Sequence, residues 1–261
     1  MTSLVKAELQ KLFTTRLWWI LLIVLLLLTG VFLGFFIGFA GVESDGVAGI
    51  PATDDPKWAQ LAWTTGAQMS WIMVMILGVI MMTSEFRYQT ITGTFLTTPR
   101  RSQVIVAKLV SGLVVGALYA LAVLVFQALV VIPTVLISGG ELSLSESHIP
   151  QISLGILVST ALYAVFGIGL GALVRNQIAG IVGAIVWTYI IESIFTAIPA
   201  LQGVGKWLPS GAANALMSID IDTGLGVPHW LPAWGGALVL VGYGLLFAAI
   251  ASATTVRRDI T

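Results

Sequence analysis

The chain has 261 residues, of which 57% are hydrophobic and only 9% charged, and its net charge is zero. A soluble domain carries about 25% charged residues, so a chain this poor in charge could not cover its surface in water. The composition therefore excludes a soluble enzyme and argues against a nucleic-acid-binding domain, and the lack of cysteine excludes disulfides and thiolate metal sites.

Six segments are apolar enough to cross a bilayer, which takes about 20 residues of helix. The first is uncharged and longer than the about 7–15 apolar residues of a signal peptide, so we expect it to stay as a span. The third contains Pro133, which predicts a kink or an end there. The predicted spans are residues 18–40, 63–83, 103–137, 150–174, 177–198 and 233–256. We expect a single all-α transmembrane domain over residues 1–261.

Three segments outside the spans have patterns of their own. Residues 2–16 alternate apolar and charged positions at helical spacing, which predicts an amphipathic helix on the inner membrane face. Residues 84–102 form the longest inner loop, where charged, aromatic and hydroxyl side chains mix. Residues 199–232 are too apolar for an ordinary loop and too short to span, which predicts short helices at the outer leaflet.

Basic residues predict the orientation. With six spans, both termini lie on one side, and every lysine and arginine except Lys57 and Lys206 falls on that side. Loops that carry lysine and arginine stay in the cytoplasm. We therefore expect both termini in the cytoplasm and an acidic outer surface.

The sequence contains no pattern typical of a catalytic, nucleotide or metal site. Glu192 is the one charged residue that lies deep in the outer half of a predicted span. A carboxylate in lipid is a functional candidate by default. We expect Glu192 either to face a translocation path or another subunit, or else to reach the outer interface or accept a hydrogen bond from Thr188 or Tyr189. Gln127, inside the third span, is a weaker path candidate.

The inner loop resembles the type-two permease subunits of ATP-binding-cassette (ABC) exporters. The residues that carry this resemblance are Glu85, Phe86, Arg87, Tyr88 and Thr90, then Phe95, Leu96 and Pro99, and then Ala107 and Lys108. Gln89 departs from the pattern, since the family has glycine before the threonine. The opening Glu8 and Lys11 with Arg16, and Leu208-Pro209 before the last span, are also similar to the family.

The resemblance implies a partnership. Two such permeases pair as a homodimer or with a paralogue, and two cytosolic ATPase subunits bind ATP and Mg²⁺, so this chain itself needs no cofactor. The N-terminal helix, with Lys6, Glu8 and Lys11, and a coupling helix over residues 84–98 would contact the ATPases. The outer helices would form a lid over the path. The expected cargo is hydrophobic or amphipathic, such as a drug, a peptide antibiotic or a lipid, and the expected location is a prokaryotic plasma membrane.

Two other function classes stay open. An ion-driven secondary transporter would act without an ATPase and needs carboxylates near the midplane, for which Glu192 alone qualifies. A membrane-embedded lipid-processing enzyme needs a catalytic constellation, and the sequence shows none.

Overall fold

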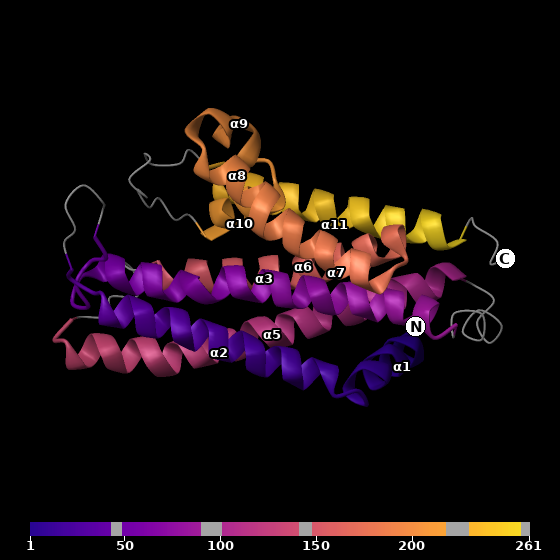
Figure 1. Ribbon diagram of the computed structural model, residues 1–261, viewed down its shortest axis with the longest axis horizontal. Coiled ribbons are helices and arrows are strands. Elements are labelled where there is room, and N and C mark those ends of the chain that lie inside the picture. The colour runs from indigo at the N-terminus through magenta and orange to yellow at the C-terminus, as the bar shows by residue number, and fades with distance from the viewer. Residues whose placement is uncertain (43–48, 90–100, 141–147, 218–229, 257–261) are drawn as a thin grey trace.

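The structure is a computed structural model that describes residues 1–42, 49–89, 101–140, 148–217 and 230–256. All regular secondary structure in these ranges is helical, without a strand (Figure 1). The elements are α1 (Thr2–Phe13), α2 (Leu17–Gly38), α3 (Pro56–Arg87), α5 (Arg101–Ile137), α6 (Ile149–Val174), α7 (Gln177–Ile185), the π-helix η1 (Val186–Ile191), α8 (Glu192–Ala197), the 3₁₀ turn η2 (Pro199–Leu201), α9 (Gln202–Gly205), α10 (Pro209–Met217) and α11 (Ala233–Val256).

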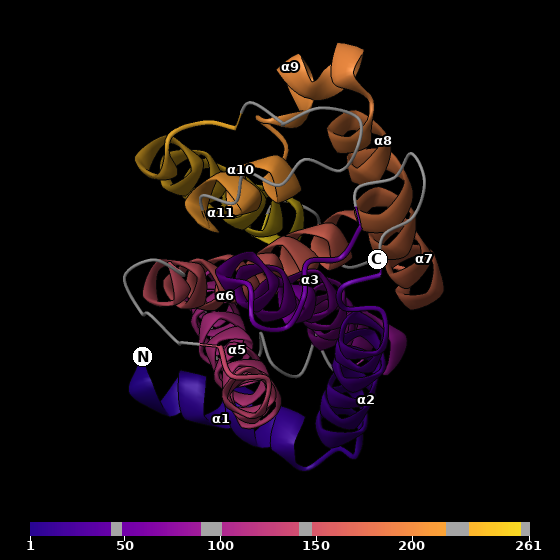
Figure 2. The same ribbon diagram turned by 90° about the vertical axis from the view of Figure 1, so that its left-hand side faces the viewer.

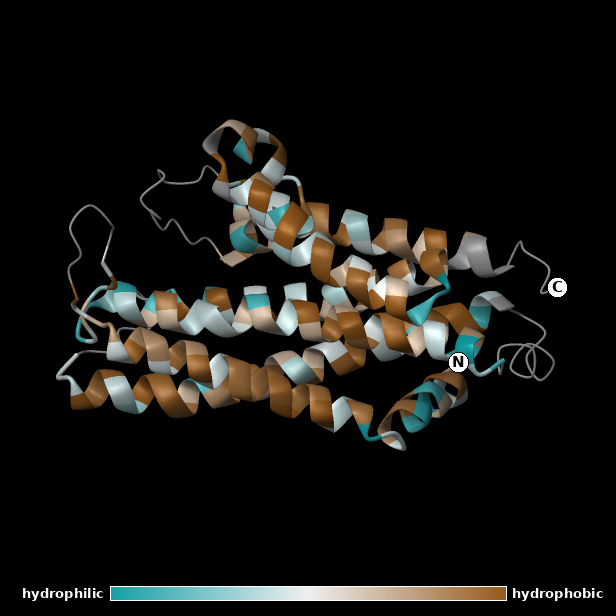
Figure 3. Ribbon diagram, in the orientation of Figure 1, coloured by the Kyte–Doolittle hydropathy of each residue, from teal (hydrophilic) through white to brown (hydrophobic). Residues whose placement is uncertain are grey.

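Six helices in the described ranges are long and apolar enough to cross a membrane, which confirms an all-α polytopic membrane fold. Their bounds are Leu17–Gly38, Pro56–Arg87, Ser102–Ile137, Ile149–Val174, Gln177–Thr196 and Ala233–Ile250. Figure 3 shows apolar residues along the long helices and polar residues gathered on α1 and at the helix ends. One end of the bundle holds α1 and the last residues of α3, and we call it the terminal end.

The second spanning helix, α3, is longer than the predicted span 63–83 at both ends. It begins at Pro56 because the Asp55 side chain caps it, accepting a hydrogen bond from the backbone N–H of Lys57 at 2.8 Å. Proline suits the first helical position, where its missing N–H is no loss. A helix of 32 residues reaches about 48 Å, so α3 extends beyond the roughly 30 Å hydrocarbon layer.

The third spanning helix, α5, continues through Pro133 to Ile137, so the proline does not end it. Proline removes one backbone donor, but the neighbouring Thr134 hydroxyl donates to the Val130 carbonyl oxygen at 2.7 Å. Such side-chain bonds help a membrane helix tolerate proline.

The centre of the bundle is the pair α3 and α6, which run parallel. In an apolar 18-residue stretch of each helix, 72% of the residues of α3 and 67% of those of α6 are buried inside the protein, against 17–28% in the other four spans. Figure 2 shows α3 and α6 between α2 and α5 on one side and α10 and α11 on the other. Three side-chain hydrogen bonds join the pair at nearly constant sequence separations of 88 to 90 residues: Trp63 to Ser153 at 3.0 Å, Ser70 with Thr160 at 2.8 Å, and Trp71 to Ser159 at 2.9 Å.

Glycines allow this pair to pack backbone against backbone. A Cβ atom built on Gly167 of α6 would lie 2.1 Å from the carbonyl oxygen of Met75. One built on Gly78 of α3 would lie 2.3 Å from the carbonyl oxygen of Ala164. Without an apolar driving force between helices in lipid, such close contact is a main source of attraction.

The segment after the fifth span forms the short helices α9 and α10, as predicted. Most residues of α10 are buried, because it packs against α6 and α11. A Cβ on Gly236 of α11 would lie 2.4 Å from the Ala212 carbonyl oxygen. α10 is therefore an embedded helix of the bundle, while Trp207 before it is exposed.

Candidate functional site

Four charged side chains from three parts of the chain meet at the terminal end, and we call them the ion cluster: Glu8 and Lys11 of α1, Glu85 of α3 and Lys108 of α5. The Nζ atom of Lys108 lies 2.6 Å from Glu8 Oε2 and 3.1 Å from Glu85 Oε1. It also donates to the carbonyl oxygen of Met81 at 3.2 Å. Only 2% of Lys108 is exposed, so these three acceptors replace water around its ammonium group.

Lys11 completes the ion cluster from its solvent side. Its Nζ atom lies 2.6 Å from Glu8 Oε1 and 2.9 Å from Glu85 Oε1, while 48% of its side chain is exposed. Burial by itself would raise the pKa of the Glu8 carboxyl, but Lys108 and Lys11 outweigh burial and hold that pKa below its usual 4.5. Burial would lower the pKa of Lys11, but its bonds to Glu8 and Glu85 raise that pKa above 10.5.

The ion cluster fixes α1 to the terminal ends of α3 and α5. Two carboxylates face two ammonium groups, so the buried charges balance. Removing one partner from a buried pair typically costs about 3–5 kcal/mol, because the other charge is left unpaired. α1 therefore cannot move away from α3 and α5 without breaking both of the ion pairs that link it to them, Lys11–Glu85 and Lys108–Glu8.

The sequence located these charges but not their pairing. Glu8, Lys11 and Glu85 stood among the predicted contact residues, while Lys108 entered only through the family resemblance. Lys108 lies several residues inside a predicted span, and a charge there needs a partner. That signal was not used; it would have led to Glu85, which the sequence places at the same end of the neighbouring span.

The predicted coupling segment, residues 84–98, is described only at its start. Its first residues belong to α3, which ends at Arg87. Arg87 donates to Gln177 Oε1 at 3.1 Å, and Tyr88 is 67% exposed. Phe86 lies under the guanidinium of Arg175, 5.3 Å from its ring centre.

The remaining predicted contact residues differ in whether the structure describes them and in how exposed they are. Thr90, Phe95 and Leu96 lie outside the described residues. Lys6 is on the exposed side of α1, whereas Glu8 faces inward and is buried. Among the predicted contact residues that the structure describes, Lys6, Lys11, Arg87 and Tyr88 are thus exposed, whereas Glu85 is buried.

Glu192 lies in the protein interior, with 1% of its surface exposed. Trp187 donates its indole N–H to Glu192 Oε1 at 2.5 Å, and the Tyr163 hydroxyl donates to Oε2 at 3.0 Å. Ser210, at the start of α10, is close enough to interact electrostatically with the carboxylate, although its buried hydroxyl oxygen meets no hydrogen-bond geometry.

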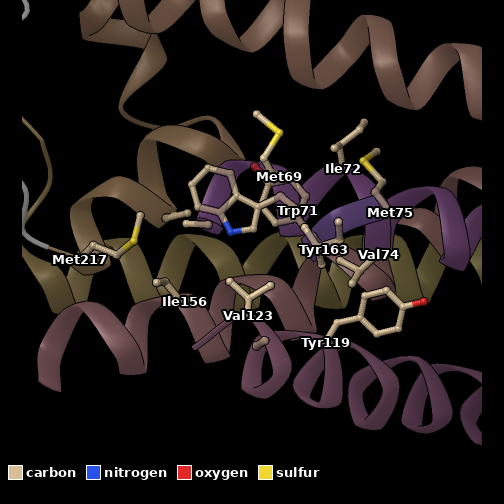
Figure 4. Packing of buried hydrophobic residues seen from close by; sticks show 14 of the residues in the cluster. Met69, Trp71, Ile72, Val74, Met75, Tyr119, Val123, Ile156, Tyr163 and Met217 are labelled. Atoms are coloured by element: carbon tan, nitrogen blue, oxygen red, sulfur yellow. The ribbon is translucent and has the colours of Figure 1, made fainter. Parts of the chain in front are cut away.

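The partners expected for Glu192 were wrong. Thr188 instead points to the Met75 sulfur at 3.6 Å, and the Tyr189 hydroxyl donates to the Met69 sulfur at 3.3 Å. Figure 4 shows Met69 and Met75 on one side of α3. The sequence could not assign these contacts because they depend on an irregular stretch of helix, η1, next to Glu192.

The true partner on α6, Tyr163, belongs to the aromatic core. Its ring stacks on Trp71 of α3 with centres 5.2 Å apart and planes 6° from parallel (Figure 4). Glu192 therefore reaches the centre of the bundle through Tyr163.

Gln127 joins α5 to α3 instead of standing free. Its Nε2 donates to the Trp63 carbonyl oxygen at 2.7 Å, and the residue is fully buried. Its Oε1 atom is buried without a hydrogen-bond partner. Gly66 makes room for this side chain, since a Cβ there would lie 2.9 Å from the amide.

A comparison with protein families supports the resemblance found in the inner loop. The family model described as "ABC-2 family transporter protein" matches residues 4–192, which include most of α1, the ion cluster, the first four spans and the fifth span as far as Glu192. A comparison with curated proteins found no match. Because the family match covers well over half of its length, the chain belongs to the ABC-2 family of transporter membrane proteins.

Proposed function

We propose that this chain is the permease subunit of an ABC exporter in a prokaryotic plasma membrane, with both termini in the cytoplasm. Two copies, or this chain and a paralogue, would form the path for a hydrophobic or amphipathic cargo. Two separate cytosolic subunits would bind ATP and Mg²⁺ and supply the energy. Family membership supports a role as a membrane transport component, and the ion cluster is the observation that supports coupling to a cytosolic subunit.

The ion cluster suits a coupling device because it lies where a cytosolic subunit would dock. Arg87 and Tyr88, at the end of α3, are exposed next to it. Force applied there would act directly on α3, and through Glu85 and Lys108 on α5 and α1. Since α3 is packed along α6 by backbone contact, the same force would reach the centre of the bundle.

This arrangement separates two roles. Arg87 and Tyr88 are contact residues, because their side chains are exposed. Glu85, Lys108 and Glu8 are positioning residues, because they are buried and act through the helices that they join. Reversing the charge of Glu85 would disrupt the ion cluster itself, so Arg87 is the better position for testing docking.

The test is co-purification from the native host. A tagged chain, extracted in mild detergent, should retain an ATPase subunit in equal amount and hydrolyse ATP. Arg87→Glu should lower the retained ATPase without changing the yield of the chain. Lys206→Glu, beyond the fifth span, is the matched control and should change neither. A chain that is stable and monodisperse alone, with no ATPase in any preparation, would contradict the proposal.

A further inference from the structure

The fifth span is not one continuous α-helix. α7 passes at Val186 into the π-helix η1, which ends at Ile191, and α8 then begins with Glu192. π-turns are rare and occur mostly as single inserted turns at functional sites. An inserted π-turn shifts the helix beyond it by one residue, a rotation of about 100°.

The π-turn places Trp187 and Glu192 on the same face. In an α-helix, residues five apart point about 140° away from each other around the axis. Here the Trp187 indole N–H reaches Glu192 Oε1 at 2.5 Å. The bond is strong because its acceptor is a carboxylate shielded from water. The π-turn and this bond therefore depend on each other.

Glu192 also joins the π-turn to two other elements. Tyr163 of α6 donates to its second oxygen at 3.0 Å. Ser210 brings the N-terminus of α10 beside the carboxylate, where the helix dipole favours a negative charge. The first turn of α10 packs closely against the end of α9, since a Cβ on Gly211 would lie 2.1 Å from the Gly205 carbonyl oxygen.

We propose that Glu192 is a positioning residue. Its hydrogen bond with Trp187, which we call the lock, holds the π-turn of the fifth span and, with it, the position of α10. Each carboxylate oxygen of Glu192 accepts a hydrogen bond from the protein and only 1% of its surface is exposed, which favours a positioning role over that of a cargo ligand. When the bond to Trp187 breaks, the π-turn relaxes to α-helix, and α8 and α10 rotate relative to α7. This inference concerns the spanning bundle and holds whether or not an ATPase drives it.

Two contacts with α3 report on the two sides of the lock. On the α7 side, a Cβ on Gly180 would lie 4.0 Å from the Cβ of Val79, which matches the separation in a disulfide of about 3.8 Å. Within the π-turn, Thr188 lies against Met75, with 3.6 Å between its hydroxyl and the sulfur. Because the chain contains no cysteine, paired cysteines can be placed at either contact without background.

The first experiment compares these pairs in membranes. Val79→Cys with Gly180→Cys should form a disulfide on mild oxidation, and Met75→Cys with Thr188→Cys should be bridged by a short bifunctional thiol reagent. Adding Trp187→Phe or Glu192→Ala should abolish the second bridge and leave the first disulfide intact. Tyr189→Phe, which removes a neighbouring hydroxyl outside the lock, should affect neither. Retention of the second bridge in both lock variants would overturn the proposal, and so would loss of both pairs together.

The second experiment follows α10. Ala213 of α10 is fully buried, so Ala213→Cys should react slowly with a membrane-permeant maleimide. Adding Glu192→Ala should raise the labelling rate by roughly tenfold to a hundredfold, the factor expected for losing a hydrogen bond to a charged group. Ala172→Cys, equally buried in α6, is the control and should stay protected. An unchanged rate at position 213 would contradict a link between Glu192 and α10.

Discussion

Lys108→Met is the sharpest perturbation of the ion cluster. Methionine fills a similar volume without charge, so Glu8 and Glu85 lose their buried cation. Breaking a buried pair costs about 3–5 kcal/mol. Because Lys11 still contacts both carboxylates from the solvent side, we expect the loss in unfolding free energy to lie at the lower end of this range, at about 3 kcal/mol.

The size of this effect can be compared within the ion cluster. Lys11→Met removes a half-exposed partner and should cost at most about 1 kcal/mol. For a chain of this size, about 3 kcal/mol corresponds to roughly 6–12 °C in Tm, and Lys11→Met to less than about 4 °C. The assay is thermal unfolding of the detergent-purified chain, followed by the loss of its monodisperse peak.

A rescue variant separates charge from packing. The triple change Lys108→Met, Glu8→Gln and Glu85→Gln removes every buried charge of the ion cluster, and replacing a buried ion pair by uncharged side chains often changes stability little. It should recover most of the lost Tm. Equal shifts for Lys108→Met and Lys11→Met, or no rescue by the triple change, would refute the view that Lys108 is the buried centre of the ion cluster.

Three further outcomes follow from the structure. Gly167→Ala should sharply lower the yield of folded chain, because the new Cβ would overlap the Met75 carbonyl oxygen. Gly183→Ala is its control and should fold normally, because the space around Gly183 is open; size-exclusion profiles would show both results. Gln127→Met removes the 2.7 Å hydrogen bond to Trp63, a longer one of 3.4 Å to Ala62, and one unpartnered oxygen. Stability should therefore change by about 1 kcal/mol or less, seen as a small shift in Tm, and transport should be unchanged; loss of transport alone would return Gln127 to the path. The pKa of Glu8 in the folded chain lies below 4.5, so its charge stabilises the fold fully above that pH. This stabilisation is lost as the pH falls through the pKa of the folded chain, so proteolysis of α1 should rise only in acid.

The sequence predicted the spans well, because hydropathy is a property of each segment alone. It missed the early start of α3, which rests on local capping by Asp55. It could not show that α3 pairs in parallel with α6. That pairing depends on small residues such as Gly78 and Gly167, whose partners lie about ninety residues away in the sequence.

The charged sites show the same limit. Composition makes a buried Glu192 or Lys108 conspicuous, because a charge in lipid needs a reason. Its partner, however, is set by helix rotation. One inserted π-turn is enough to give Glu192 the indole of Trp187 and to leave Thr188 and Tyr189 with methionine sulfurs.

The most direct test of the central claim is energy coupling in proteoliposomes. The chain, reconstituted with its co-purified ATPase, should move fluorescent amphipathic compounds or labelled lipids when ATP is added, and should stop when ATP is replaced by a non-hydrolysable analogue. Vesicles that hold the chain alone should show no transport under an imposed pH gradient. Transport driven by that gradient without an ATPase would contradict the account and make the chain a secondary transporter.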